Sequence, residues 1–367
     1  MSLTSRQQGA ITLASGGLLM GTIGVFVEEA RLDALTLVFF RCLFGFVSLA
    51  AYCAWKGVFT RAQFTPRTVV LALISGVLMV TQWVGFFDAI HRTSIAVATV
   101  VFHVQPFWVV LIGAALFNER LGADRLGWIA TAFVGLVLAS GVIAAGNLQG
   151  HSSYLIGLSE ALLGSLMYAS VTLIAKSLGE LRPHLLTLTQ CAVGVICLPL
   201  IAPLVAPLTL THIGPMQWFW LIGMGVLHTG LSYVLIYGAL PKLSTPVIAV
   251  LLFVYPLTAI VVDALVYGRA LSLSQLAGMA LIVTASLGVN LGWPLLTLLN
   301  PGGRAVTRSK ARRPHRLLMR SVTAAKSRRA SPARTESRTG RGRTRARSTR
   351  AARPASAYAA PPRRAES

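Results

Sequence analysis

A few charged, imidazole and aromatic side chains stand inside long apolar stretches of this sequence, where polar groups are costly. Arg41 lies about two turns inside one such stretch, so its guanidinium reaches water only with difficulty. It could serve as the counter-charge of an anionic or zwitterionic small molecule, or form a gate with Glu28 or Glu29. A fixed ion pair with one of these acids is the simpler interpretation, because buried charges usually pair.

Other acidic residues occur in or near the apolar stretches. Together with Glu28 and Glu29, Glu160 is a candidate for a gate or for carrying protons, since acids within membranes commonly belong to proton relays. Asp88 and Asp263 fall near the ends of their stretches, where a solvated helix cap is the more ordinary role.

Two prolines, Pro106 and Pro256, interrupt apolar stretches at a spacing of 150 residues. A proline inside a helix removes one backbone hydrogen bond and leaves the carbonyl four residues earlier without a partner. Those carbonyls belong to Phe102 and Leu252. Paired interruptions in two halves of a membrane protein predict a binding site at the membrane centre, although packing kinks without a ligand would give the same pattern.

Aromatic and polar side chains surround these prolines and could line an amphipathic pocket. The expected lining consists of Arg41, Trp83, Phe87, His103, Gln105, Pro106, Trp108, His228, Tyr233, Tyr237, Tyr255 and Pro256. For any one of these residues taken singly, packing within a helix bundle is the simpler interpretation.

The composition describes the elements that must hold these residues. Hydrophobic residues are 54% of the 367 residues and charged residues only 12%, about half the charged share of an average soluble domain. The apolar residues form long blocks rather than helical stripes, so we expect an all-α integral membrane protein. Ten stretches are long enough to span a bilayer: residues 9–27, 33–55, 68–90, 95–117, 126–145, 153–176, 184–206, 214–238, 244–267 and 272–293.

The two halves of the chain resemble each other at the same spacing of 150 residues. Residues 83–90 are echoed by residues 233–240 without a gap. Each half contains five expected helices, and an odd number requires two related halves to lie inverted in the membrane. We therefore expect ten transmembrane helices arranged as two inverted five-helix repeats, residues 9–145 and 153–293.

Basic residues set the expected orientation. With a cytoplasmic N-terminus, the outer side receives only Arg31, Arg92 and Arg269, whereas the inner side receives the remaining Lys and Arg of the loops. An even number of helices returns the C-terminus to the same side. We expect a multi-pass protein of a bacterial-type inner membrane with both termini in the cytoplasm.

The formal net charge of +22 is mainly a property of the C-terminal segment. Residues 1–300 hold 13 Lys and Arg against 9 Asp and Glu, whereas residues 301–367 hold 20 Lys and Arg against two acids. Residues 300–367 have no apolar period, so we expect a disordered basic cytoplasmic tail. The tail could contact anionic lipids or be an uninvolved extension, and the helical part is not expected to bind nucleic acid.

Together these features resemble the EamA family of the drug/metabolite transporter superfamily, over about residues 9–293. The resemblance rests on Arg41 in Phe39-Phe40-Arg41, on Pro106 and Pro256, and on the run from Phe117 to Leu121. It implies a secondary active transporter that moves, and by family preference exports, a small metabolite such as an amino acid or related compound by alternating access. The second half departs from the family pattern, because Arg269 stands where Glu is common.

Other classes of function find little support in the sequence. No His-Glu-x-x-His run, metal-ligand cysteine spacing or ATP-binding motif occurs, so no catalytic residue, metal or cofactor is expected. The alternatives are an integral-membrane enzyme acting on a lipid or peptide, and a scaffold that moves nothing and presents the basic tail. The sequence is compatible with a monomer and with a homodimer.

Overall fold

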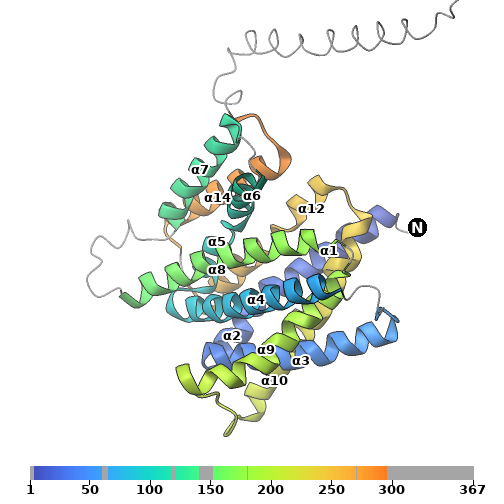
Figure 1. Ribbon diagram of the computed structural model, residues 1–367. Helices are drawn as coiled ribbons and strands as arrows, with labels where there is room; N and C mark the ends of the chain where they lie inside the picture. The colour runs from blue at the N-terminus through green and yellow to red at the C-terminus, as the bar shows by residue number, and fades with distance from the viewer. Residues whose placement is uncertain are drawn as a thin grey trace, which may run out of the picture. The chain divides into compact units, whose positions relative to one another are not determined.

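The computed structural model describes residues 4–59, 65–117, 121–139, 152–179, 181–269 and 271–295. Within these ranges every regular element is a helix and there is no strand (Figure 1). Glu119 and the basic tail 300–367 lie outside the described residues, and so does the expected end of the first repeat at residue 145.

The first half of the described chain forms seven helices. Their bounds are Ser5–Gly21 (α1), Ile23–Ala30 (α2), Ala34–Trp55 (α3), Pro66–Arg92 (α4), Ile95–Phe102 (α5), Gln105–Phe117 (α6) and Ala123–Ala139 (α7). Four of them begin at a side-chain cap, whose oxygen accepts a hydrogen bond from the backbone amide three residues later. The caps are Thr4, Asp33, Thr65 and Ser94.

The second half begins with a long helix and contains seven α-helices in the described residues. Their bounds are Ser152–Ser177 (α8), Pro183–Val205 (α9), Pro215–Gly223 (α10), Ser232–Ala239 (α11), Thr245–Leu251 (α12), Val254–Tyr267 (α13) and Leu273–Leu291 (α14). A π-helix, Met224–Leu231 (η2), joins α10 to α11, and a 3₁₀ turn, Leu240–Lys242 (η3), follows α11. Residues 215–242 thus form one continuous helical span.

Two of the expected helices are broken shortly before a proline. α5 ends at Phe102, four residues before Pro106, and α12 ends at Leu251, five residues before Pro256. The proline ring crowds the carbonyl of the preceding turn and supplies no amide hydrogen, so the helical hydrogen-bond ladder stops there. The breaks therefore fall where the two proline positions predict them.

Eight helices of the described chain are long and apolar enough to cross a membrane. They are Ser5–Ala30, Ala34–Trp55, Pro66–Arg92, Ile95–Leu116, Ser152–Ser177, Pro183–Val205, Pro215–Lys242 and Leu273–Leu291. The expected helix 244–267 is divided by its proline break, and the expected helix 126–145 is described only to Ala139. The protein is a multi-pass helical membrane protein, and the count of ten spans stays a prediction.

Helices from the two halves lie side by side, with α4 along α8, α7 along α14 and α3 along α9 (Figure 1). The contact of α7 with α14 is made at two glycines. A Cβ built on Gly278 would lie 2.5 Å from the carbonyl oxygen of Gly135, and a Cβ built on Gly135 would lie 2.8 Å from the carbonyl oxygen of Gly278. Glycine at both positions lets the two backbones approach this closely.

The contact of α3 with α9 is reciprocal. A Cβ on Gly45 of α3 would lie 3.5 Å from the sulfur of Cys191 on α9, and a Cβ on Gly194 of α9 would clash with the sulfur of Cys42 on α3. In the sequence, Cys42 precedes Gly45 by three residues, as Cys191 precedes Gly194. Equivalent positions of the two halves therefore face each other.

Hydrogen bonds repeat this reciprocity. Arg41 Nε on α3 donates to the hydroxyl of Thr229 on η2 at 3.0 Å. Gln190 Nε2 on α9, the residue equivalent to Arg41, donates to the hydroxyl of Ser75 on α4 at 2.8 Å. The second expected helix of each half thus bonds to the third expected helix of the other half.

Candidate functional site

The helices enclose a cavity of about 830 Å³ that residues from both halves line. This volume is typical of small-molecule sites. The cavity brings together eight of the twelve expected lining residues: Arg41, Trp83, His103, Gln105, Pro106, Tyr233, Tyr237 and Tyr255. Aliphatic and aromatic side chains make up most of the remaining wall, so the cavity has the amphipathic character expected from the sequence.

Both proline breaks border the cavity. Phe102, the last residue of α5, and His103, which follows it, belong to the cavity wall, as do Leu252 and Phe253 between α12 and α13. His103 Nδ1 lies 2.7 Å from the carbonyl oxygen of Thr99, which assigns the proton to Nδ1 because a carbonyl can only accept. In the neutral imidazole, the Nε2 atom is then an acceptor in the cavity wall.

Arg41 is buried, with only 2% of its surface exposed, and it is part of the cavity wall. Its Nε bonds to the hydroxyl of Thr229. The guanidinium carbon lies 4.2 Å from the centre of the Trp83 ring and 5.4 Å from that of Phe87. Two aromatic rings thus pack near the guanidinium, and such cation–π contacts stabilise a desolvated cation.

The expected ion pair between Arg41 and Glu28 or Glu29 is wrong. Glu28 binds Arg269, and Glu29 accepts a hydrogen bond from Tyr267. Throughout the described ranges, no carboxylate forms an ion pair with Arg41. The reason is geometric. In the first span, Ile23 is the last residue that lines the cavity, and both acids lie further along α2.

Four expected residues lie outside the cavity wall: Phe87, Trp108, His228 and Pro256. The Trp108 indole donates to the hydroxyl of Ser165 on α8 at 3.0 Å. His228 Nε2 lies 3.0 Å from the hydroxyl of Thr22, between α1 and α2. The other two residues are buried in the surrounding packing. Trp108 and His228 thus join helices to one another rather than facing the cavity.

The cavity wall also contains residues that the sequence reasoning missed. Tyr168, Thr172 and Lys176 follow one another at intervals of four on α8, so they share one face of the helix, and all three line the cavity. A polar stripe of this period in an apolar stretch was the available signal. Gln82 and Arg125 also line the cavity, and no comparable spacing marks them.

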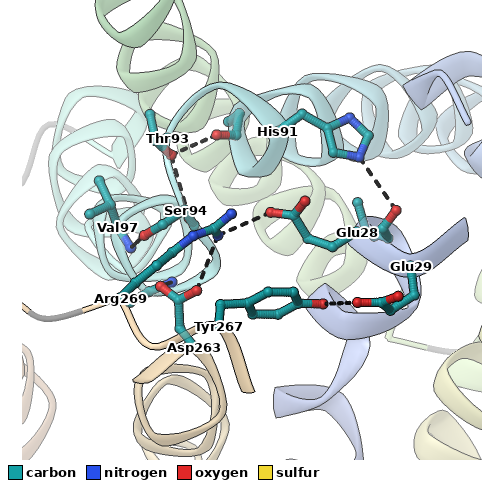
Figure 2. Close-up of polar contacts among 12 residues, drawn as sticks. Glu28, Glu29, His91, Thr93, Ser94, Val97, Asp263, Tyr267 and Arg269 are labelled. Carbon is teal, nitrogen blue, oxygen red and sulfur yellow. Dashed lines mark hydrogen bonds and ion pairs between the residues drawn. The ribbon is translucent and has the colours of Figure 1, made fainter. Parts of the chain in front are cut away.

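Figure 2 shows a second polar group, which we name the Arg269 cluster: Glu28, Glu29, Asp263, Tyr267 and Arg269. Arg269 Nη1 lies 3.1 Å from a carboxylate oxygen of Glu28 and 3.2 Å from one of Asp263. The Tyr267 hydroxyl donates to Glu29 at 3.1 Å. The cluster therefore ties α2 of the first half to α13 and the residues after it in the second half. None of its members lines the cavity.

Asp263 is not the solvated cap that its position suggested. Its side chain is only 1% exposed. One carboxylate oxygen accepts the Arg269 bond, and the other accepts a hydrogen bond from the backbone amide of Ala96, in the first turn of α5, at 3.1 Å. Burial lowers the pKa of the Arg269 guanidinium, the Glu28 and Asp263 carboxylates raise it, and the net shift is upward, so the cation is retained.

A further ion-pair group joins α4 to α8. Arg92 Nε lies 2.6 Å from a carboxylate oxygen of Asp88 and 3.5 Å from one of Glu160. An Nη atom of Arg92 also donates to the hydroxyl of Ser153 at 3.2 Å. Asp88 and Glu160 are thus partners in an ion pair between the two halves, and Asp88 is more than a solvated cap.

The described residues contain no group of three or more His, Cys, Asp or Glu side chains that could hold a metal ion. The cavity wall instead presents two guanidinium groups, an ammonium group, amides, an imidazole and phenols. Such groups can bind and orient a small molecule by hydrogen bonds, charge and aromatic contact.

Comparison with known proteins gives consistent relatives. The chain is 30% identical over 283 residues to an uncharacterized transporter, YxxF, of Bacillus subtilis strain 168, covering 77% of this chain and 89% of the relative. It is 26% identical over 287 residues to an uncharacterized transporter of Archaeoglobus fulgidus, covering 78% and 96%. It is 25% identical over 256 residues to the pseudopaline exporter CntI of Pseudomonas aeruginosa strain UCBPP-PA14, covering 68% and 84%.

A solved structure and a family model complete the comparison. A crystal structure, described only as that of a protein, has a TM-score of 0.56 and 18% identity, covers 78% of this chain and 98% of its own, and shows the fold alone. The model of the EamA-like transporter family matches residues 7–141 and 155–291. Because these matches cover both halves of the helical part, the chain belongs to the EamA-like transporter family and is a membrane transporter.

Proposed function

We propose that the protein is a secondary active transporter that exports a small metabolite, such as an amino acid or related compound, by alternating access of two inverted repeats. The observation that carries this proposal is the position of the cavity. It is lined by both halves at both proline breaks, and the Arg269 cluster, whose members lie outside the cavity wall, ties the halves together. A site between two related halves is what alternating access requires.

The repeats of this proposal are residues 9–145 and 153–293, with five helices each. The reciprocal contacts of α3 with α9, and of α7 with α14, support an axis that exchanges the two halves. The exchanged bonds of Arg41 and Gln190 support it as well. Two broken helices, α5–α6 and α12–α13, are then the fourth and ninth spans, and the tenth span is α14.

The conformation in this proposal is open to the cytoplasm. Lys176 and Arg125 line the cavity near helix ends that the distribution of basic residues assigns to the inner side. The Arg269 cluster lies at the ends assigned to the outer side. Breaking the cluster while closing the walls around Lys176 would expose the cavity outward, and Glu28 and Glu29 are gate residues in this scheme.

Glu160 is a candidate for ion coupling, because it shares the cation of Arg92 with Asp88 between the halves. Protonation of one acid would release part of this contact and make the arrangement of α4 and α8 dependent on a proton gradient. Flux in liposomes that is unchanged by an imposed pH gradient would exclude proton coupling.

The relatives support export, since one of them is named as an exporter of pseudopaline. They offer no support for an enzyme acting on a lipid or peptide, or for a scaffold that moves nothing. We extend the proposal to the basic tail, residues 300–367, as a cytoplasmic contact for anionic lipids. Truncation after Asn300 tests the tail: unchanged activity and membrane stability would show that the extension is not needed.

The experiment that tests the function is uptake into everted membrane vesicles against a panel of metabolites. Arg41→Ala and Trp83→Ala should abolish the accumulation of the transported compound, whereas Arg67→Gln, an exposed substitution at the start of α4, should leave it unchanged. Vesicles that accumulate nothing above those without the protein, over a broad panel and with imposed ion gradients, would refute the proposal.

A further inference from the structure

The Arg41 guanidinium has more hydrogen-bond donors than the protein uses. A guanidinium carries five N–H donors, and among the described residues Arg41 makes one hydrogen bond, from Nε to Thr229. The rings of Trp83 and Phe87 lie near the group, and no carboxylate in the described part of the chain pairs with it. A buried charge without a counter-ion is costly, so the site is incomplete without an anion.

The charges of the cavity wall point the same way. Three charged residues line the described cavity, and all three are cations: Arg41, Arg125 and Lys176. The described acids lie elsewhere, and five of them are held by partners in the Arg269 cluster or by Arg92. A cationic substrate would meet repulsion from the wall without a compensating acid, whereas an anion would be attracted along the whole cavity.

The wall also limits the size and charge of that anion. Apart from the three cations, the cavity is bounded mainly by aliphatic and aromatic side chains. Only Arg41 among the cations is deeply buried, so one carboxylate would have a desolvated cation as its partner, whereas a second would have only the exposed Arg125 and Lys176, whose attraction solvent screens. The planar fork of a guanidinium matches a carboxylate, which it can bind through two parallel hydrogen bonds.

Gln82 is a neutral polar residue of the same cavity wall. It precedes Trp83, the residue whose ring lies beneath the guanidinium, and it is only 2% exposed. Its Oε1 atom has no hydrogen-bond partner although the residue lines the cavity. Buried amide oxygens usually have a hydrogen-bond partner, and a hydroxyl or amino hydrogen of a bound molecule is a candidate for this one.

We infer that the cavity selects small organic monocarboxylates, with Arg41 as the receptor of the carboxylate and the apolar wall as the receptor of the carbon skeleton. This inference rests on the proposed function, because it names the substrate class of the same cavity. An aromatic cavity alone would also accept neutral and cationic compounds, whereas a cavity with Arg41 in its wall should prefer anions.

Three matched probes test the inference: 3-phenylpropionate, its neutral amide and 3-phenylpropylamine, which share a carbon skeleton and differ in charge. The full-length protein is placed in nanodiscs of neutral lipid, and binding is measured by calorimetry. We expect the carboxylate to bind about tenfold to a hundredfold more tightly than the amide, as for hydrogen bonds to a charged group, and the amine not to bind.

Substitutions assign this preference to one side chain. Arg41→Gln should remove the difference between carboxylate and amide, and Arg41→Lys should restore part of it, because the charge returns without the fork. Arg67→Gln, which changes an exposed charge outside the cavity, should leave the difference intact. The comparison of probes on the unsubstituted protein does not depend on whether a variant folds.

Two results would overturn the inference: binding of the amide or amine as tight as that of the carboxylate, or a carboxylate preference that survives Arg41→Gln in a folded variant. Efflux of the same probes from proteoliposomes separates this inference from the proposed function. Carboxylate-selective binding without efflux would refute transport and leave the binding site standing. Efflux of the amine or amide in preference to the carboxylate would refute the substrate class and leave transport standing.

Discussion

Removal of the Arg269 charge should open the cavity to the outer side. In Arg269→Gln, Glu28 and Asp263 lose their shared cation, and Asp263 keeps only the backbone amide of Ala96. Removing one partner of a fully buried ion pair costs about 3–5 kcal/mol. The Arg269 side chain is 38% exposed, so solvent screening reduces this to about 1–2 kcal/mol.

The substitution destabilises only the state in which the two halves meet at the Arg269 cluster. In the outward-exposed state these contacts are already broken, so its free energy is unchanged. A shift of about 1.4 kcal/mol changes the ratio of two states tenfold. We therefore expect about a tenfold rise in the fraction of molecules that expose the cavity outward.

A cysteine at position 113 reports this fraction. Gly113 lines the cavity, and a Cβ built there meets open space, so Gly113→Cys should fit without strain. The rate of labelling by a membrane-impermeant maleimide is measured from each side, in right-side-out and inside-out vesicles. A parent with only the native cysteines, of which Cys42, Cys53 and Cys191 are buried, supplies the blank.

In the otherwise unsubstituted protein, the reporter should react mainly from the cytoplasmic side. Arg269→Gln should raise its outside rate about tenfold, Arg269→Lys should raise it less, and Arg31→Gln, an exposed charge outside the cluster, should have no effect. An outside rate that is the same with and without Arg269→Gln would refute the gate. Equal labelling from both sides in the unsubstituted protein would refute the assigned conformation.

Gly278→Ala places a methyl group against the α7 backbone and should lower stability by about 1–3 kcal/mol. Gly238→Ala, whose methyl group meets open space, should not lower it. Equal melting temperatures of the two variants in detergent would contradict the close contact. Thr229→Val removes the hydroxyl that binds the buried guanidinium and should lower stability by about 1–2 kcal/mol, as measured by thermal unfolding. Thr229→Ser keeps a hydroxyl and should recover most of the loss. Trp83→Leu removes the ring beneath that guanidinium, at a cost of about 1–2 kcal/mol. It should raise the apparent KM of vesicle uptake about tenfold, whereas Trp55→Leu, at an exposed position, should leave the KM unchanged. An equal KM in Trp83→Leu and the unsubstituted protein would contradict the assigned contact.

The helical spans were largely predictable because the membrane imposes simple rules on a sequence. A bilayer requires long apolar stretches, and their approximate bounds follow from composition alone. A proline in a helix interior removes a backbone hydrogen bond and favours a break. The helices do break shortly before Pro106 and Pro256, whereas α9 continues through Pro199 and Pro203, so a proline alone marks where a break is possible. The family resemblance, carried by the same prolines and by Arg41, is confirmed by the family model.

The partners of the charged residues were not predictable. Sequence proximity favoured Glu28 or Glu29 for Arg41, but the acids bind residues more than 200 positions away in the chain. Asp263, which reads as a solvated cap, is buried against the start of α5. These partners depend on which helices pack together and at what depth, and neither is encoded by hydrophobic periodicity.

By itself the sequence determined that the chain is a helical membrane protein of two similar halves, which polar residues stand within its apolar stretches and which prolines could break a helix. These properties depend on local chemistry and on the solvent that surrounds each segment. The tertiary structure decided that Arg41 would meet Thr229 and Trp83 instead of an acid, and that Arg269 would hold the two halves together. Electrostatic partners are chosen by distances of a few ångströms in space, and only the packing of distant helices brings them that close.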